Sequence, residues 1–181
     1  SSVRTVWSPG TGDGYKLPLH VRITNLVRDN TPEQARRTLD AAKIVRRLDG
    51  ESAGEGFAIL AEIGCSQVSF GTGEAAQWSS CFTVIHRPLR LPRETTFVLA
   101  SLLEPYPGET VPKLVGAILD GSGGTLPDWS EWLERYLSLS LLPLLRLAAE
   151  QGVGFEAHLQ NSLLTLKNGW PDRFYVRDLE G

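Results

Sequence analysis

The sequence has few cysteines, no excess of positive charge and no long hydrophobic run. Cys65 and Cys81 are the only cysteines, and they have no metal-binding spacing to each other or to a nearby histidine, so neither a disulfide framework nor a zinc site is expected. The formal net charge of -3 argues against a nucleic-acid-binding protein. The most apolar stretch, residues 137–147, is too short to span a bilayer. We therefore expect no nucleic-acid partner, no membrane partner, reduced thiols and a cytoplasmic location.

The 181 residues can form one sizeable domain or two small lobes, and 41% hydrophobic with 22% charged residues is typical of a chain that buries a core. The sequence begins with serine instead of methionine and has no polar tail at either end. We therefore expect it to be a piece of a longer protein.

Turn residues and alternating β-formers predict a sheet-rich first half. Thr31, Pro32 and Gln34 supply an N-cap, a proline at the first helical position and a capping-box partner, so a helix is expected over 32–48 with one apolar stripe. A loop is expected over 71–80. Strands are expected at 3–7, 15–24, 57–70, 81–86 and 95–103.

The second half is predicted to contain a buried helix and a hairpin. Asp128 and Glu131 form a plausible capping box for a helix that is apolar almost all round to residue 147, so central burial is expected, with a kink at Pro143. The predicted fold class is α+β, with a mostly antiparallel sheet and a packed helix followed by the buried helix and a β-hairpin. Turn signals divide the chain into a lobe at 1–105, a connecting segment at 106–126 and a second lobe at 127–181.

Asn168 and Gly169 give a strong hairpin signal because both accept positive φ angles. If the chain reverses over 168–171, residues whose numbers add up to 339 face each other, and Asn161 lies opposite Asp178. An amide oxygen and a carboxylate would suit Mg²⁺, which prefers oxygen ligands. An ordinary hairpin with polar residues near its open end is the alternative.

Basic and hydroxyl residues near the start suggest an anionic ligand. The segment Ser1-Ser2-Val3-Arg4-Thr5 combines hydroxyls with a guanidinium, which suits phosphate oxygens. Lys16 and Arg22 share a strand face if no bulge intervenes, and Arg28 follows. Exposed basic residues on a solvated face explain the same spacing equally well.

Other polar residues carry weaker signals. Thr24 ends a strand where a sheet meets a loop, a usual location for binding groups. His158 lies among Glu156, Gln160 and Asn161 and could donate to an anionic oxygen, whereas the other two histidines, His20 and His86, are expected to be structural. No Walker A, dinucleotide-binding or G-x-S-x-G motif is present.

Four motifs together resemble the siderophore synthetases that work independently of nonribosomal peptide synthetases, the IucA/IucC family. They are S-S-V-R-T, K-L-P-L-H-V-R-I-T-N-L-V-R, E-A-H-L-Q-N and R-D-L-E-G, and they occur in order along the whole chain. The resemblance implies a cupped-hand fold, of which this chain covers the fingers and the start of the palm. It also implies a ligase for siderophore biosynthesis and iron acquisition that uses ATP and Mg²⁺ to adenylate citrate or a related acid. An amine, hydroxylamine or alcohol then accepts the acyl group.

The resemblance also assigns roles to residues that match the motifs. Ser2, Arg4, Thr5 and Gln160 would contact ATP, and Lys16 would neutralise charge near the α-phosphate. Thr24, Arg28 and His158 would bind the carboxylate substrate. The Mg²⁺ ligands would be Glu156, Asn161 and Asp178. A homo-oligomer is compatible with the sequence, which leaves the oligomeric state open.

Two other functions are compatible with the sequence. A kinase-like phosphotransferase also uses a strand lysine and an Asn–Asp metal pair, but no H-R-D motif precedes Asn161, and Asp178 is followed by Leu-Glu-Gly instead of Phe-Gly. The second alternative is a nucleotide-binding fragment or a scaffold without turnover, and we expect the chain on its own to be inactive as an enzyme.

Overall fold

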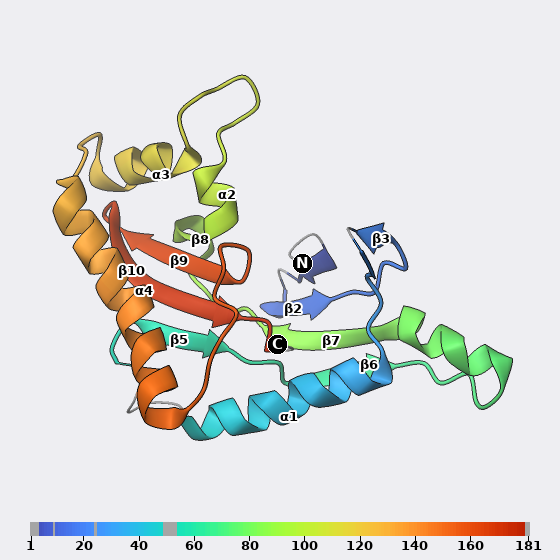
Figure 1. Cartoon of the computed structure of the whole chain (residues 1–181). Helices are drawn as coiled ribbons and strands as arrows, with labels where there is room; N and C mark the ends of the chain where they lie inside the picture. Colours follow the sequence, from blue (N-terminus) through green and yellow to red (C-terminus); the bar gives the residue numbers. More distant parts are fainter. Residues whose placement is uncertain (1–3, 9, 24, 49–53, 180–181) are drawn as a thin grey trace. The chain divides into compact units, whose positions relative to one another are not determined.

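The computed structural model describes residues 4–8, 10–23, 25–48 and 54–179 (Figure 1). As predicted, they form an α+β protein with mostly antiparallel sheets. The chain makes two compact units that interleave along the sequence. The first contains residues up to 47, 60–90 and those from 178 onward, and the second contains 48–59 and 91–177. The lobe boundaries inferred from the turn signals stay a prediction.

The first unit contains a four-stranded sheet in the order β1-β2-β7-β6. Its strands are β1 (Thr5–Trp7), β2 (Asp13–Lys16), β6 (Gly64–Gln67) and β7 (Thr83–Pro88). Alternate residues of β7 are buried, as a strand with one inward face requires. The inward residues include Ile85, which is fully buried, and Arg87.

The predicted strand over 15–24 is wrong in its length. The chain leaves β2 after Lys16, passes Pro18 and adopts a left-handed backbone at His20 (φ 47°). A short hairpin of β3 (Arg22–Ile23) and β4 (Leu26–Val27) follows. Lys16 is buried and Arg22 is exposed, so the expected shared basic face does not form.

Helix α1 (Pro32–Leu48) confirms the predicted N-terminus. The Gln34 amide donates to the Thr31 hydroxyl at 3.1 Å, and the Thr31 amide donates to the Gln34 side-chain oxygen at 2.9 Å, which is a reciprocal capping box. The buried positions follow helical spacing and form the predicted stripe: Ala35, Thr38, Ala42 and Val45.

Three other predicted elements differ in the structure. The segment predicted as a strand over 57–70 forms β5 (Phe57–Leu60) and β6, which pair in different sheets. The predicted loop contains a 3-10 helix, η2 (Glu74–Phe82). The predicted strand over 95–103 follows the short 3-10 helix η3 (Arg93–Thr95) and comprises β8 (Thr96–Val98) and helix α2 (Leu99–Leu103), because leucine and alanine favour helix after the β-branched residues end.

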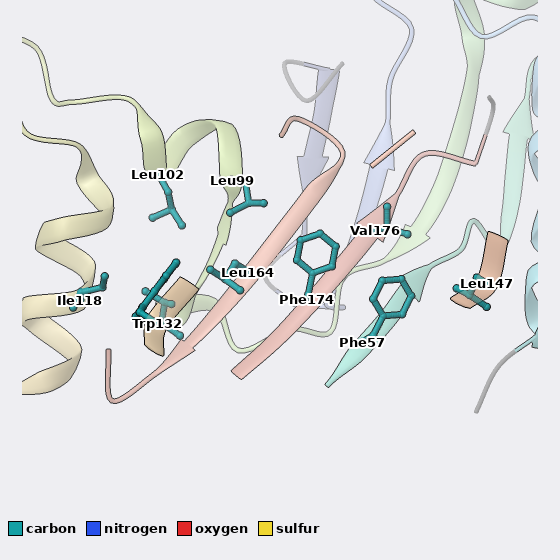
Figure 2. Close-up of a cluster of buried hydrophobic side chains, with 10 residues drawn as sticks. Phe57, Leu99, Leu102, Ile118, Trp132, Leu147, Leu164, Phe174 and Val176 are labelled. Atoms are coloured by element: carbon teal, nitrogen blue, oxygen red, sulfur yellow. The ribbon is translucent and has the colours of Figure 1, made fainter. Parts of the chain in front are cut away.

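The second unit is built on the sheet β5-β10-β9-β8. Strands β9 (Ser162–Lys167) and β10 (Trp170–Arg177) form its centre, and helices α3 (Lys113–Ser122) and α4 (Trp129–Gln151) contribute to one buried cluster with it. Figure 2 shows Phe57 of β5 beside Phe174 of β10, and their nearly parallel rings lie 6.0 Å apart between centroids. Ile118 of α3 and Trp132 of α4 belong to the same cluster.

The β9–β10 hairpin confirms the predicted turn but not the predicted register. Asn168 (φ 53°) and Gly169 (φ 79°) form a two-residue loop, so Lys167 pairs with Trp170. One extra residue between 171 and 173 forms a bulge, after which paired residue numbers add up to 338. The Arg177 amide accordingly donates to the Asn161 carbonyl at 2.9 Å. The expected Asn161–Asp178 pairing is therefore wrong by one residue.

Helix α4 begins as predicted but is not buried all round. Asp128 accepts hydrogen bonds from the amides of Ser130 and Glu131, and the helix continues through Pro143. One side packs in the core through Trp132 and Leu147. On another side, four leucines that follow one another at intervals of four residues are each more than one-third exposed within the described part of the chain: Leu133, Leu137, Leu141 and Leu145. The prediction that this helix is buried on all sides is therefore wrong for the described residues.

Candidate functional site

The predicted site residues divide between the two units. Ser2 and Thr24 lie outside the described residues. The first unit contains Arg4, Thr5, Lys16, Arg28 and Asp178. The second unit contains Glu156, His158, Gln160 and Asn161.

In the first unit the sheet brings three predicted residues together. Thr5 of β1 lies directly opposite Lys16 of β2, so both side chains share one face of the sheet. The Lys16 ammonium is buried and donates to Oδ1 of Asp178 at 2.7 Å. A hydroxyl, an ammonium and a carboxylate from three distant parts of the sequence therefore belong to one neighbourhood.

Lys16 and Asp178 are part of a larger group of alternating charges. Arg87 lies on the same sheet face as Lys16, and its Nη2 is 3.8 Å from Oδ1 of Asp178. Arg87 also donates through Nε (3.0 Å) and Nη2 to Oε1 of Glu62, which is fully buried. Burial raises the pKa of the Asp178 carboxyl, but the charge and hydrogen bond of Lys16 and the charge of Arg87 outweigh it and lower the pKa to about 2.

Arg4 supports the segment that carries Arg28. Its Nη1 donates to the carbonyl oxygens of Arg28 (3.1 Å) and Asp29 (3.0 Å) and to Oδ1 of Asn30 (2.9 Å). The Asn30 amide in turn donates to the carbonyl oxygens of Lys16 (2.9 Å) and Thr83 (2.8 Å). These bonds join the segment 28–30 to both central strands of the sheet, so Arg4 positions the backbone of the predicted substrate-binding residue Arg28.

In the second unit, residues 155–158 alternate in exposure ahead of β9. Phe155 and Ala157 pack against the core, whereas Glu156 and His158 are exposed. The side chains of Glu156 and His158 therefore point to the same side of the chain. The Gln160 backbone amide donates to Nδ1 of His158 at 3.2 Å, which places the proton of the neutral imidazole on the outer nitrogen, Nε2.

Asn161 is buried and its amide group is oriented by the backbone. Its Nδ2 donates to the Glu156 carbonyl at 3.2 Å, and its own backbone amide donates to the His158 carbonyl at 2.8 Å. In the described part of the chain Oδ1 of Asn161 accepts no hydrogen bond. This oxygen is therefore available to a ligand from outside the described chain.

The predicted metal ligands have suitable chemistry for Mg²⁺. The carboxylates of Glu156 and Asp178 and the amide oxygen of Asn161 are hard oxygen donors, which Mg²⁺ prefers over nitrogen or sulfur. The lowered pKa keeps Asp178 ionised throughout the neutral range. The donor set present in the chain fits the ion.

A cavity of about 770 Å³ in the second unit involves none of the predicted site residues. It lies among α2, α3 and the hairpin turn, and its walls include Leu102, Lys113, Asp120 and Asn168. Its size would suit a small ligand. The polar residues of 156–161 are not in its walls, so the cavity supports none of the predicted roles.

Three residues important to the first unit were missed by the sequence reasoning. Glu62 and Arg87 form the buried ion pair, and Asn30 joins the segment 28–30 to the sheet. The alternation of Thr83, Ile85 and Arg87 could have indicated an inward arginine, because it places residue 87 on the buried face of β7. Glu62 and Asn30 have no comparable sequence signal.

None of the helices in the described part of the chain combines the length and the apolarity that a membrane span requires.

Solved structures of an aerobactin synthetase and of a petrobactin biosynthesis protein share this fold. ATP-bound aerobactin synthetase IucA from a hypervirulent pathotype of Klebsiella pneumoniae superposes with a TM-score of 0.79 at 22% identity, covering 99% of this chain and 34% of that one. The petrobactin biosynthesis protein AsbB from Bacillus anthracis gives a TM-score of 0.77 at 19% identity, covering 99% and 30%. At these identities the likeness establishes the fold.

Curated relatives match the whole chain but are about three times as long. An L-2,3-diaminopropanoate–citrate ligase from Staphylococcus aureus is 37% identical over 191 aligned positions, which cover 100% of this chain and 32% of the relative. A spermidine–citrate ligase from Bacillus anthracis is 28% identical and is covered to 31%. The chain therefore spans about a third of the length of these relatives, which are named as citrate ligases.

Two family models match separate parts of the sequence. The model described as "Ferric iron reductase FhuF-like transporter" matches residues 130–181. The IucA/IucC family model matches residues 1–104, which is more than half of the chain. With the agreement in fold and in curated relatives, this match establishes that the chain belongs to the IucA/IucC family.

Proposed function

We propose that this chain is the part of an IucA/IucC-type siderophore synthetase that binds Mg·ATP and a citrate-like carboxylate. In the whole protein, a carboxylate oxygen of the acid attacks the α-phosphorus of ATP. The bond from that phosphorus to the bridging oxygen breaks, and pyrophosphate leaves. An amine, hydroxylamine or alcohol then attacks the acyl carbon, loses its proton, and displaces AMP.

The first step needs charge cancellation, because two anions must meet and pyrophosphate must be released. Arg4, Thr5 and Ser2 are assigned to the phosphates together with Gln160. Lys16 is assigned to the α-phosphate. Its ion pair with Asp178 holds it on the sheet face beside Thr5.

The carboxylate substrate is assigned to Arg28, Thr24 and His158. The guanidinium of Arg28 can form a bidentate contact with a carboxylate. The outer nitrogen of His158 carries the donor proton and is on an exposed side chain, so it can donate to an anionic oxygen.

Glu156, Asn161 and Asp178 are assigned to Mg²⁺. When bound, the ion would offset negative charge on the phosphates. Asn161 contributes an oriented amide oxygen, and Asp178 contributes a carboxylate that stays ionised. The second step requires a deprotonated nucleophile, and we assign no base to it.

One observation carries the proposal. The buried ammonium of Lys16 is held by Asp178 on the same sheet face as Thr5, in a chain whose curated relatives are named as citrate ligases. The Asp178 carboxylate offsets the cost of burying the ammonium, and the ion pair fixes the ammonium on the face that carries the Thr5 hydroxyl. An anionic phosphate could accept hydrogen bonds from both the ammonium and the hydroxyl.

Product analysis tests the reaction class. The full-length protein that contains this chain is incubated with ATP, Mg²⁺, citrate and a panel of amines, and the nucleotide products are separated. AMP and pyrophosphate in equal amounts are expected. ADP would support the kinase-like alternative and contradict adenylation. If the isolated chain binds Mg·ATP but forms neither product, it is a binding fragment.

A further inference from the structure

Three side chains that are far apart in the sequence converge in the first unit. Nδ1 of His20 is 3.0 Å from Oδ2 of Asp29 and 3.2 Å from Sγ of Cys81, and the sulfur is 4.0 Å from Oδ2. His20 follows β2, Asp29 follows β4, and Cys81 lies in η2. One imidazole nitrogen, one carboxylate oxygen and one thiol sulfur therefore lie within 4.0 Å of one another.

The arrangement differs from that of a catalytic Cys–His–Asp triad. Both the carboxylate and the sulfur approach the same ring nitrogen, Nδ1. In a catalytic Cys–His–Asp arrangement the thiol and the carboxylate use opposite nitrogens of the ring. Without an ion, the Nδ1–H group can donate to Oδ2 of Asp29 at 3.0 Å while the Cys81 thiol donates to the same oxygen at 4.0 Å. A cation bound by all three atoms would replace these hydrogen bonds.

The three distances lie within about half an ångström of those in a metal-ligand triangle. In a tetrahedral zinc site with metal–ligand bonds near 2.0–2.3 Å, neighbouring ligand atoms are about 3.3–3.6 Å apart. The three distances here are 3.0, 3.2 and 4.0 Å, so small side-chain rotations bring all three into range. A thiolate with an imidazole favours zinc-type transition metals over Mg²⁺ or Ca²⁺.

Backbone hydrogen bonds hold the three residues in place. The Leu19 amide donates to the Arg28 carbonyl at 2.9 Å, which joins the residues directly before His20 and Asp29. The Asn30 amide donates to the Ser80 carbonyl at 3.2 Å, which joins the residues next to Asp29 and Cys81. The ligands are therefore positioned by the sheet and its loops before any ion binds.

We propose that His20, Asp29 and Cys81 form a binding site for one zinc-type divalent transition metal. Three protein ligands leave a fourth position for water or another ligand. The His20 side chain is 59% exposed, so an ion can reach the site from solvent. None of the three ligands is assigned to Mg·ATP, although Arg4, which is so assigned, donates to the backbone carbonyl of Asp29 at 3.0 Å.

The experiment uses the purified protein under reducing conditions, titrated with Co²⁺, whose bond to a thiolate gives a strong charge-transfer absorption. We expect this absorption to saturate at one equivalent and to be displaced by Zn²⁺. Cys81→Ser should abolish it. His20→Ala and Asp29→Asn should each weaken Co²⁺ binding at least tenfold. Cys65→Ser is the matched control, because Cys65 is exposed and outside the cluster, and it should bind as the unaltered protein does.

A second measurement needs no variant and so does not depend on how a variant folds. Zn²⁺ should slow alkylation of Cys81 at least tenfold, measured by peptide mass spectrometry, with Cys65 as the internal reference. Equal alkylation of Cys81 with and without Zn²⁺ would overturn the proposal. So would the absence of a thiolate band at one equivalent, or unchanged affinity in both His20→Ala and Asp29→Asn.

Discussion

Lys16 and Asp178 are 162 positions apart in the chain and form a buried ion pair, with Nζ donating to Oδ1 at 2.7 Å. The side chain of Lys16 is 4% exposed and that of Asp178 is 16% exposed. Since a buried ammonium without a counter-charge is costly, this pair couples the end of β2 to the residue that follows β10.

Asp178→Asn should make the free energy of unfolding depend less strongly on pH in the acid range. The folded-state pKa of Asp178 is about 2, below its ordinary value of 3.8. The carboxylate therefore stabilises the folded state above about pH 4, and this contribution of about 2 kcal/mol is lost as the pH falls through about 2. The free energy of unfolding of both proteins, measured by denaturant titration between pH 5 and pH 2, checks this. The two curves should converge toward pH 2, and a constant difference would contradict the assignment.

Removing Glu62 should destabilise the protein strongly. Glu62→Ala leaves the buried guanidinium of Arg87 without its carboxylate, and such a loss costs about 3–5 kcal/mol. Denaturant unfolding at neutral pH measures it. Asp40→Ala is the matched control, because its ion pair with Lys43 (2.7 Å) is exposed and should contribute much less to stability. Equal effects of the two substitutions would refute a stabilising role for the buried pair.

Gly121→Ala should loosen the contact between α3 and the hairpin turn. A Cβ at Gly121 would lie 2.7 Å from the Gly169 backbone nitrogen, so the backbone must shift, at a cost of about 1–3 kcal/mol. Gly116→Ala in the same helix is the control, since nothing lies within 4 Å of its Cβ, and it should be neutral or stabilising by up to about 1 kcal/mol. Thermal unfolding followed by circular dichroism distinguishes them. If the melting temperature of Gly121→Ala is no lower than that of Gly116→Ala, α3 and the hairpin turn do not approach each other as closely as the structure shows.

Local sequence signals predicted the ends and turns of several elements. The Thr31–Gln34 capping box and the Asn168–Gly169 turn depend on neighbouring residues, so they could be identified from the sequence. The predicted sum of 339 placed the loop at 169–170, one residue later than the observed loop, which gives a sum of 337. The bulge after Pro171 could not be predicted, because it depends on how β10 packs, and it raised the sum to 338. Short apolar runs are compatible with either a strand or a helix, and α2 is a helix in a segment that was predicted as a strand.

The site was predicted less completely than the fold because its contacts join distant positions. The motifs named Lys16 and Asp178 but gave no indication that they form an ion pair or that Arg87 extends it to Glu62. The spacing argument that excluded a zinc site from the two cysteines considered only nearby residues. It could not detect that folding brings Cys81 to His20.

Calorimetry of Mg·ATP binding tests the central claim most directly. The unaltered protein, Asp178→Asn and Asp40→Asn are compared at neutral pH, after near-ultraviolet circular dichroism has established that each is folded. Asn accepts the left-handed backbone of residue 178 (φ 72°), so the substitution removes the charge without straining the chain. We predict that Asp178→Asn weakens binding of Mg·ATP at least tenfold while Asp40→Asn leaves it unchanged. Equal affinity of all three proteins would contradict the claim that Asp178 belongs to a Mg·ATP site.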